Sequence, residues 1–147
     1  MTEQAIVRVG DVMTPEIRSI GRTATVAEAI EAMREAGVSS LVVERRNEDD
    51  EYGLVAITDI AREVVANDRP ADRVNVYEVM TKPVLTVPVD MQTMFAVRLL
   101  VRFKLSRALV IDHARGPVGI VTLRDMVLRS ALNTAKSQKK RATPSAV

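Results

Sequence analysis

Two hydrophobic patterns alternate along the chain and predict alternating strands and helices. Short apolar runs bounded by polar residues are typical of strands, and they lie near residues 18–20, 41–44, 53–57, 84–87, 108–112 and 118–121. Apolar residues three or four positions apart predict helices over about 25–37, 59–66, 93–104 and 123–133. The resulting order is strand, helix, strand, strand, helix, and it occurs twice.

The first predicted helix carries start and stop signals. Thr25 and Glu28 have the spacing of a capping box, in which each side chain satisfies a backbone N–H of the other residue. Ile30 and Met33 continue an apolar stripe, and Gly37 suits the left-handed conformation that ends many helices. We therefore expect this helix to end at Gly37.

The twofold order reflects an internal repeat. Residues 11–14 (DVMT) recur as residues 78–81 (EVMT), 67 positions later, and the same offset aligns Ser39 with Ser106. After one deleted residue the offset is 66, and residues 53–59 (GLVAITD) align with residues 119–125 (GIVTLRD). Two copies of one supersecondary unit make up nearly the whole chain.

These repeats predict an α+β fold of two tandem β-α-β-β-α units. We place the first repeat at 9–67, a linker at 68–76, the second repeat at 77–133 and a disordered basic tail at 134–147. A unit of about sixty residues buries too little surface to be stable alone. We therefore expect the repeats to pack sheet to sheet about a pseudo-two-fold axis.

The repeated motifs resemble those of tandem cystathionine-β-synthase-type domains, the CBS pair or Bateman module. Each copy opens with VMT and closes with a glycine, an apolar stretch and an aspartate, and the resemblance runs from about Val9 to Leu132. It implies a regulatory module for an adenosine-containing ligand: AMP, ADP or ATP first, with S-adenosylmethionine or NAD as alternatives. It also implies a homodimer.

A nucleoside site is expected in the second repeat. A carboxylate at the start of a helix, here Asp125, can accept hydrogen bonds from both ribose hydroxyls, and Thr122 can reach the ribose or the first phosphate. The resemblance further implies that Thr86 lines the pocket and that Arg107 binds phosphate. It also places the apolar side chains of Val84 and Val87 against the adenine.

The same residues have a structural interpretation. Thr122 and Asp125 also form a plain helix cap, which is the commoner role of such a pair. The alternatives are therefore a nucleoside site and a cap.

The first repeat departs from the pattern. Ala56 stands at the position of Thr122, and Ser40 at that of Arg107, which puts phosphate binding there in doubt. Ser19, Thr58 and Asp59 remain as its candidate ligand residues, although Thr58 is displaced from the hydroxyl position of the motif.

Composition and charge narrow the classes of function. The chain of 147 residues has no cysteine, which excludes disulfide scaffolds, thiolate nucleophiles and Cys-type metal sites. Its net charge of +2 divides into a mildly acidic body and a tail that holds Lys136, Lys139, Lys140 and Arg141. The tail permits contact with nucleic acid as a minority interpretation, but no aromatic residue interleaves its charges. Neither a secretory signal nor a bilayer-spanning run is evident, so we expect a cytoplasmic protein without membrane contact.

Catalytic and metal-binding machinery is not evident in the sequence. His113 has no histidine or cysteine partner, and the acid run 48–51 lacks the ligand spacing of a calcium loop. The methionines follow the apolar pattern of a core or dimer surface. We therefore expect no enzymatic activity, no metal and no required cofactor.

Two hypotheses of function follow. In the first, ligand binds where the repeats meet, favours one packing of the repeats and signals occupancy to an unidentified regulated protein. In the second, the clefts are vestigial and the chain is a structural dimer or interaction module that contacts protein or nucleic acid through its tail. The ligand, the partner and the parallel or antiparallel dimer arrangement are left open by the sequence.

Overall fold

The chain folds into two compact units. The computed structural model describes residues 6–130 and divides the chain into Ile17–Val84, here the first unit, and Met1–Glu16 with Leu85–Val147, here the second unit. Residues 134–147, predicted to form a basic tail, lie outside the described residues. The units differ from the sequence repeats at both openings, because the opening segment of each repeat belongs to the unit that holds the rest of the other repeat.

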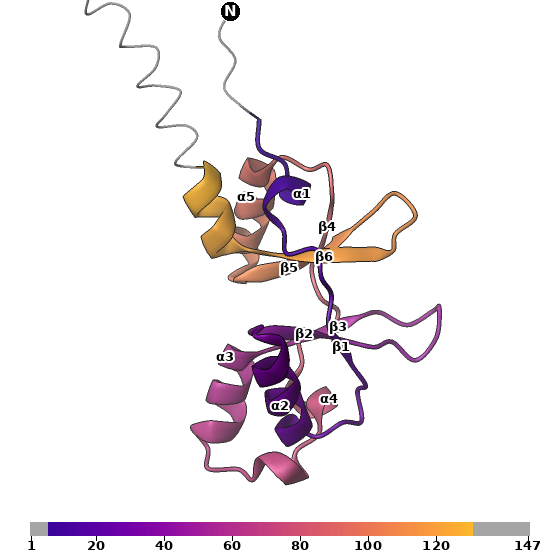
Figure 1. Cartoon of the computed structure of the whole chain (residues 1–147), viewed down its shortest axis with the longest axis vertical. Coiled ribbons are helices and arrows are strands. Elements are labelled where there is room, and N and C mark those ends of the chain that lie inside the picture. Colours follow the sequence, from indigo (N-terminus) through magenta and orange to yellow (C-terminus); the bar gives the residue numbers. More distant parts are fainter. Residues whose placement is uncertain (1–5, 131–147) are drawn as a thin grey trace, which may run out of the picture. The chain divides into compact units, whose positions relative to one another are not determined.

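Each unit contains one three-stranded sheet with helices (Figure 1). The first unit has β1 (Ser19–Ile20), β2 (Ser40–Val43), β3 (Gly53–Ala56), α2 (Val26–Ala36), α3 (Ile57–Ile60), a π-helical turn Ala61–Val65, a 3₁₀ turn Ala71–Arg73 and α4 (Val76–Val79). The second has α1 (Val9–Val12), β4 (Thr86–Pro88), α5 (Thr93–Phe103), β5 (Arg107–Ile111), β6 (Pro117–Thr122) and a helix over residues 123–130. The predicted α+β class and the repeated element order are confirmed.

The two sheets have the same topology. The strand orders are β1-β2-β3 and β4-β5-β6. The first pair in each sheet is parallel and the second antiparallel. The parallel pairing requires a crossover, and α2 and α5 supply it.

The residues predicted to begin and end α2 take these roles in the structure. The Thr25 hydroxyl accepts from the Glu28 N–H at 3.1 Å, and the Glu28 carboxylate accepts from the Thr25 N–H at 3.1 Å. Gly37 ends the helix with a φ of 67°. Lys104 ends α5 in the same left-handed conformation with a φ of 57°.

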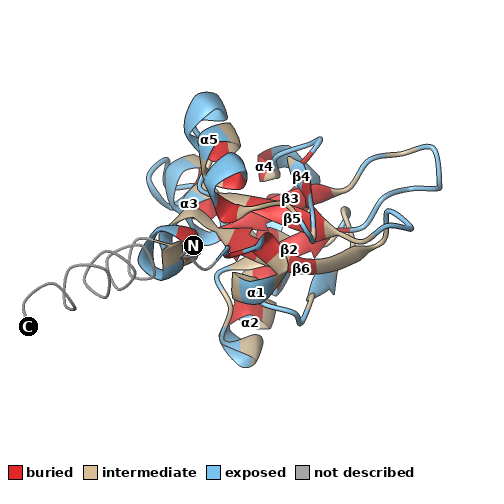
Figure 2. Cartoon of the chain, turned by 90° about the horizontal axis from the view of Figure 1, so that it is seen from above, coloured by how far each residue is buried: buried red, intermediate tan, exposed pale blue. Residues whose placement is uncertain are grey.

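One face of each sheet forms the core with the helices. In the first unit Leu41, Val43 and Val55 pack with Ala29 and Met33 of α2. In the second unit Val87, Ala108, Val110 and Val121 pack with residues of α5 and of the helix 123–130, namely Ala96, Leu100 and Met126. Buried residues accordingly follow the strands and the facing sides of the helices (Figure 2). The alternate strand residues point to the opposite face.

A segment from the start of each repeat extends the other repeat's sheet. Thr14 and Ile120 of β6 exchange backbone hydrogen bonds at 2.8 and 3.0 Å. Thr81 and Leu54 of β3 exchange theirs at 2.9 and 2.8 Å. The VMT motif of each sequence repeat therefore completes the sheet of the other.

This pairing explains why glycine stands at 53 and 119. A Cβ at Gly119 would lie 2.6 Å from Met13 Sδ and 2.8 Å from the Thr14 carbonyl oxygen. A Cβ at Gly53 would lie 2.8 Å from Met80 Sδ and 3.3 Å from the Thr81 oxygen. Any side chain at 119 would therefore push the paired backbone away.

We expect Gly119→Ala to lower the free energy of unfolding by about 2 kcal/mol, because overpacking against backbone costs roughly 1–3 kcal/mol. Chemical denaturation measures the change. The control is Gly21→Ala, whose Cβ would meet nothing within 4 Å and whose effect should stay below about 1 kcal/mol. Equal losses in the two variants would contradict the close approach.

Candidate functional site

The helix-free face of the second sheet brings three of the predicted residues together. Thr86 pairs with Leu109, and Arg107 pairs with Thr122 across β5 and β6. Paired residues point to the same side, and Arg107 and Leu109 are two positions apart on one strand. Thr86, Arg107 and Thr122 therefore share the face opposite to the core.

The next helix begins beside these residues. The Leu123 N–H donates to the Ser106 carbonyl at 2.7 Å, and the Asp125 N–H donates to Thr122 Oγ1 at 3.1 Å. Thr122 is therefore the helix cap that the structural interpretation expects. Its hydroxyl group accepts in this bond, so its hydrogen is still able to donate to another oxygen.

The Asp125 carboxylate takes little part in this cap. Its side chain is 41% exposed, and Arg124 Nη1 is 3.7 Å from its Oδ1. Within residues 6–130, the only hydrogen bond found for Asp125 beyond those of the helix itself uses its backbone N–H. The carboxylate oxygens can therefore accept hydrogen bonds from a ligand.

The matching residues of the first unit also share one face. Ser19 pairs with Val42, and Ser40 pairs with Ala56, so these residues occupy the places of Thr86, Arg107 and Thr122. Ala56 is buried and offers no hydroxyl group. Thr58 is exposed within the first turn of α3, one position beyond the start of that helix. The first unit thus keeps the geometry but lacks the hydroxyl group of Thr122 and the cation of Arg107.

Asp59 is held by the protein itself. Its Oδ2 accepts from the Ala56 N–H at 2.9 Å, and its Oδ1 accepts from Arg62 Nη2 at 2.9 Å. Its side chain is 13% exposed. The two repeats therefore make opposite halves of a capping box: Thr122 uses its hydroxyl group, and Asp59 uses its carboxylate.

Two predicted apolar residues lie elsewhere. Val87 is fully buried in the core, on the face opposite to Thr86, because neighbouring strand residues point to opposite sides. Val84 is buried at the end of the first unit, where its N–H donates to the Tyr52 carbonyl at 3.1 Å. Val87 therefore does not face an adenine on the side of Thr86, whereas the expected contact of Val84 with the adenine stays a prediction.

Arg62 is the residue of this region that sequence reasoning missed. An aspartate and an arginine three positions apart on a helix face each other, so the spacing of Asp59 and Arg62 was a usable signal. Leu128 occupies the position of Arg62 in the second repeat. The repeats therefore differ beside the carboxylate as well as at Ala56 and Ser40.

The acid run 48–51 lies in a loop, and one of its carboxylates is paired with other residues of the chain. Asp50 lies 2.8 Å from Lys82 Nζ, and its Oδ2 accepts from the Arg46 N–H at 2.8 Å. The Lys82 hydrogen bond is the main cause that holds the pKa of Asp50 well below its usual value. Among residues 6–130 no cluster of three metal-ligating side chains is found, and no helix there is long and apolar enough to cross a bilayer.

Removing the Asp50 charge should change how stability depends on pH. A carboxyl group whose pKa is lowered on folding stabilises the native state above its unfolded pKa, near 3.8, and this contribution disappears as the pH falls through the folded value. The stability difference between wild type and Asp50→Asn should thus be constant near neutral pH and shrink below about pH 4. Denaturation at several pH values measures it, and a difference that is independent of pH would contradict the pairing.

Comparison with known proteins identifies the repeated motif. The CBS domain model matches residues 9–66 and 76–131. An uncharacterized protein of Methanopyrus kandleri is 34% identical over 122 residues, which cover 82% of this chain and 61% of that protein. The inosine-5′-monophosphate dehydrogenase of Methanocaldococcus jannaschii is 29% identical over 137 residues, which cover 93% of this chain and 26% of the enzyme. The chain thus spans less than two thirds of either relative.

Solved structures with the same fold include an oligomer and a nucleotide complex. The hexameric CBS-CP12 protein from bloom-forming cyanobacteria superposes with a TM-score of 0.82 at 32% identity, covering 87% of this chain and 74% of that one. The CBS domain of a bacterial CNNM/CorC family Mg²⁺ transporter in complex with ATP has a TM-score of 0.66 at 28% identity. The match covers 82% of this chain and 84% of that one.

Proposed function

The chain belongs to the CBS domain family, with two domains in tandem, and on that premise we propose that its second repeat binds an adenosine-containing ligand. The observation that carries the proposal is the Asp125 carboxylate, which is partly exposed and accepts no hydrogen bond from the described residues. Two neighbouring ribose hydroxyls are suitable donors for its two oxygens.

The neighbouring groups suit a ribose 5′-phosphate. Thr122 can donate its hydroxyl hydrogen while it caps the helix, and Thr86 lies on the same sheet face. Arg107 pairs with Thr122 across the strands and adds a planar cation to that face. The start of the helix at residue 123 favours negative charge. We therefore propose AMP, ADP or ATP as ligand, ahead of S-adenosylmethionine or NAD.

Occupancy of this site would regulate a partner protein. The solved CBS domain of an Mg²⁺ transporter holds ATP, which supports an adenine nucleotide here as well. A ligand can shift a conformational equilibrium only by its difference in affinity for the two states. We propose that the groups at this site serve binding and that the occupied site acts on a regulated partner.

Calorimetric titration with AMP tests the site. Asp125→Asn keeps the shape of the side chain but removes its charge, and hydrogen bonds to a charged group contribute about 1.5–3 kcal/mol. We therefore expect the affinity for AMP to fall about ten-fold or more. A thermal-shift panel of AMP, ADP, ATP, S-adenosylmethionine and NAD then ranks the ligands, since a ligand that binds only the native state raises the Tm.

Asp59→Asn is the matched control, at the equivalent position of the first repeat. Because Asp59 already bonds to Ala56 and Arg62, its replacement should change the AMP affinity less than about two-fold. An unchanged affinity in Asp125→Asn, with the fold intact by circular dichroism, would refute the assignment.

A second candidate function is self-association through an exposed apolar surface. Large exposed apolar side chains gather on the outward faces of α5 and the helix 123–130: Met94, Phe95, Val101, Phe103, Val127 and Leu128. The matching positions of α2 hold Ala27, Glu28, Arg34 and Ala36. Contiguous apolar patches on a soluble protein mark interaction sites. We propose that this surface joins two copies of the chain, and the hexameric relative shows that CBS proteins can assemble.

The double variant Val101→Ser/Phe103→Ser tests this surface. Both side chains are exposed, so we expect the fold to persist and the mass by light scattering to fall from dimer to monomer. The control is Val65→Ser, an exposed apolar residue of the first unit, which should leave the mass unchanged. A monomeric wild type would contradict the proposal.

A further inference from the structure

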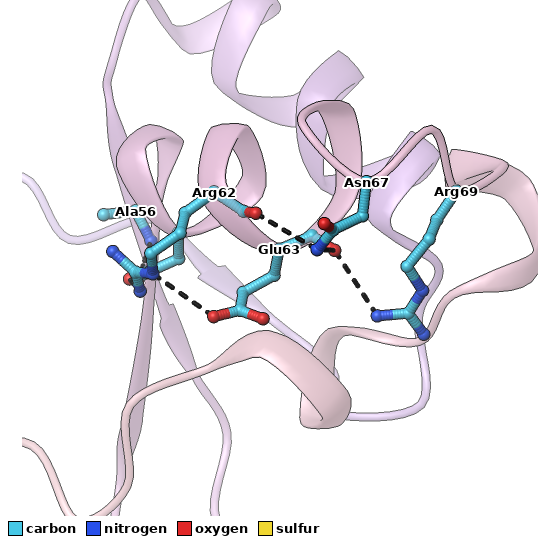
Figure 3. A network of polar contacts seen from close by, with 6 residues as sticks. Ala56, Arg62, Glu63, Asn67 and Arg69 are labelled. Atoms are coloured by element: carbon cyan, nitrogen blue, oxygen red, sulfur yellow. Dashed lines mark hydrogen bonds and ion pairs between the residues drawn. The ribbon is translucent and has the colours of Figure 1, made fainter.

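Arg62 reaches back along its helix to the group that would bind a ribose. Its Nη2 lies 2.9 Å from Asp59 Oδ1, and its Nε lies 3.2 Å from Glu63 Oε1. Figure 3 shows the guanidinium of Arg62 beside Ala56, at the start of the helix. Asp59 is further fixed by its bond to the Ala56 N–H, so each of its oxygens has a protein partner.

The π-helical turn supports this position of Arg62. Arg62 lies in the turn Ala61–Val65, where the regular helical hydrogen bonds are interrupted. Asn67 Nδ2 donates to the carbonyls of Arg62 and Glu63 at 3.4 and 3.3 Å, and Arg69 Nη1 donates to the Glu63 carbonyl at 3.5 Å (Figure 3). The backbone that carries Arg62 is therefore held at its C-terminal side.

The second repeat lacks this arrangement. Leu128 stands where Arg62 stands in the first repeat, and it is 53% exposed. The cation nearest to Asp125 in the described chain is Arg124, at 3.7 Å, which is longer than a hydrogen bond. Thr122 provides the cap through its hydroxyl group, so the carboxylate is not needed for that purpose.

We propose that Arg62 is a latch that closes the first repeat to nucleosides, so that the module takes one nucleoside per chain. This inference rests on the proposed function of the second repeat. Each Asp59 oxygen already accepts a protein hydrogen bond and the side chain is only 13% exposed, so a ribose diol has to compete with Arg62 and the Ala56 N–H for this carboxylate. With no hydroxyl group at Ala56, the helix start would lose its cap in the exchange. Arg62 thus acts as a specificity-determining residue, through Asp59.

The chain offers a residue exchange that tests the latch. Ala56→Thr/Arg62→Leu gives the first repeat the residues found at Thr122 and Leu128. Calorimetry with adenosine, which needs no phosphate contact from Ser40, should report one site in wild type and two in this variant. The conservative variant Ala56→Thr/Arg62→Lys retains a cation for Asp59, so its first repeat should bind adenosine more weakly than that of Ala56→Thr/Arg62→Leu.

The reverse exchange transfers the latch to the second repeat. Leu128 is exposed, so Leu128→Arg should fold normally and place a guanidinium three residues after Asp125. A solvated ion pair of this kind is weak, so we expect the affinity for adenosine to fall about two- to five-fold. Leu128→Gln removes the same apolar side chain without adding charge, so it is the reference against which the adenosine affinity of Leu128→Arg is compared.

Each outcome decides between the proposals. Two sites in wild type, or one site in folded Ala56→Thr/Arg62→Leu, would overturn the latch and leave the proposed function intact. Binding by that variant alone would overturn the proposed function and support the latch. No binding by any variant would overturn both proposals. Equal affinity in Leu128→Arg and Leu128→Gln would also overturn the latch.

Discussion

The fold depends on two short backbone pairings between sheet edges and opening motifs. Thr14 with Ile120 and Thr81 with Leu54 each form two hydrogen bonds, and each joins the end of a VMT motif to the last strand of the other repeat's sheet. An unpaired edge would leave backbone donors and acceptors without protein partners. The pairings satisfy these groups. The second unit is therefore built from two separate stretches of sequence, and the first unit from one stretch that excludes the opening motif of its own repeat. The glycine at 119 follows from this constraint, because the partner backbone comes too close for a side chain, and at Gly53 the closest contact is with the side chain of Met80.

The strand residues of the same sheets divide between the core and the opposite face, where the proposed site lies. The strand residues that face the helices are buried and aliphatic in both units, and their positions carry the core. The residues between them point to the other face, where Thr86, Arg107 and Thr122 lie in one unit and Ser19, Ser40 and Ala56 in the other. Because the two sets alternate, the face opposite to the core can change without loss of core packing. The repeats accordingly keep one fold while they differ in polar chemistry.

The sequence was sufficient for the fold class and for the order of elements, since hydrophobic periodicity and the internal repeat both report local structure and burial. It also located Thr25, Glu28 and Gly37, whose capping roles depend only on neighbouring residues. The exchange of the opening motifs was not predictable in this way. A repeat in sequence says which residues form equivalent elements, but it says nothing of which copy they pair with. Val87 was expected to face the adenine because the resemblance implied that this strand lines the site. The alternation of side chains along the strand places Val87 in the core instead.

The contrast between Asp59 and Asp125 shows why a cap and a ligand site need not exclude each other. A helix start requires acceptors for its first N–H groups, and either a hydroxyl group or a carboxylate can serve. Where Thr122 is the acceptor, the carboxylate three residues later is left over for another role. Where Ala56 offers no hydroxyl group, Asp59 turns toward the backbone and its remaining oxygen pairs with Arg62. One strand residue therefore sets the hydrogen bonding of the carboxylate three residues later, and the lack of a hydroxyl group at Ala56 changes the chemistry of a carboxylate that is itself unchanged.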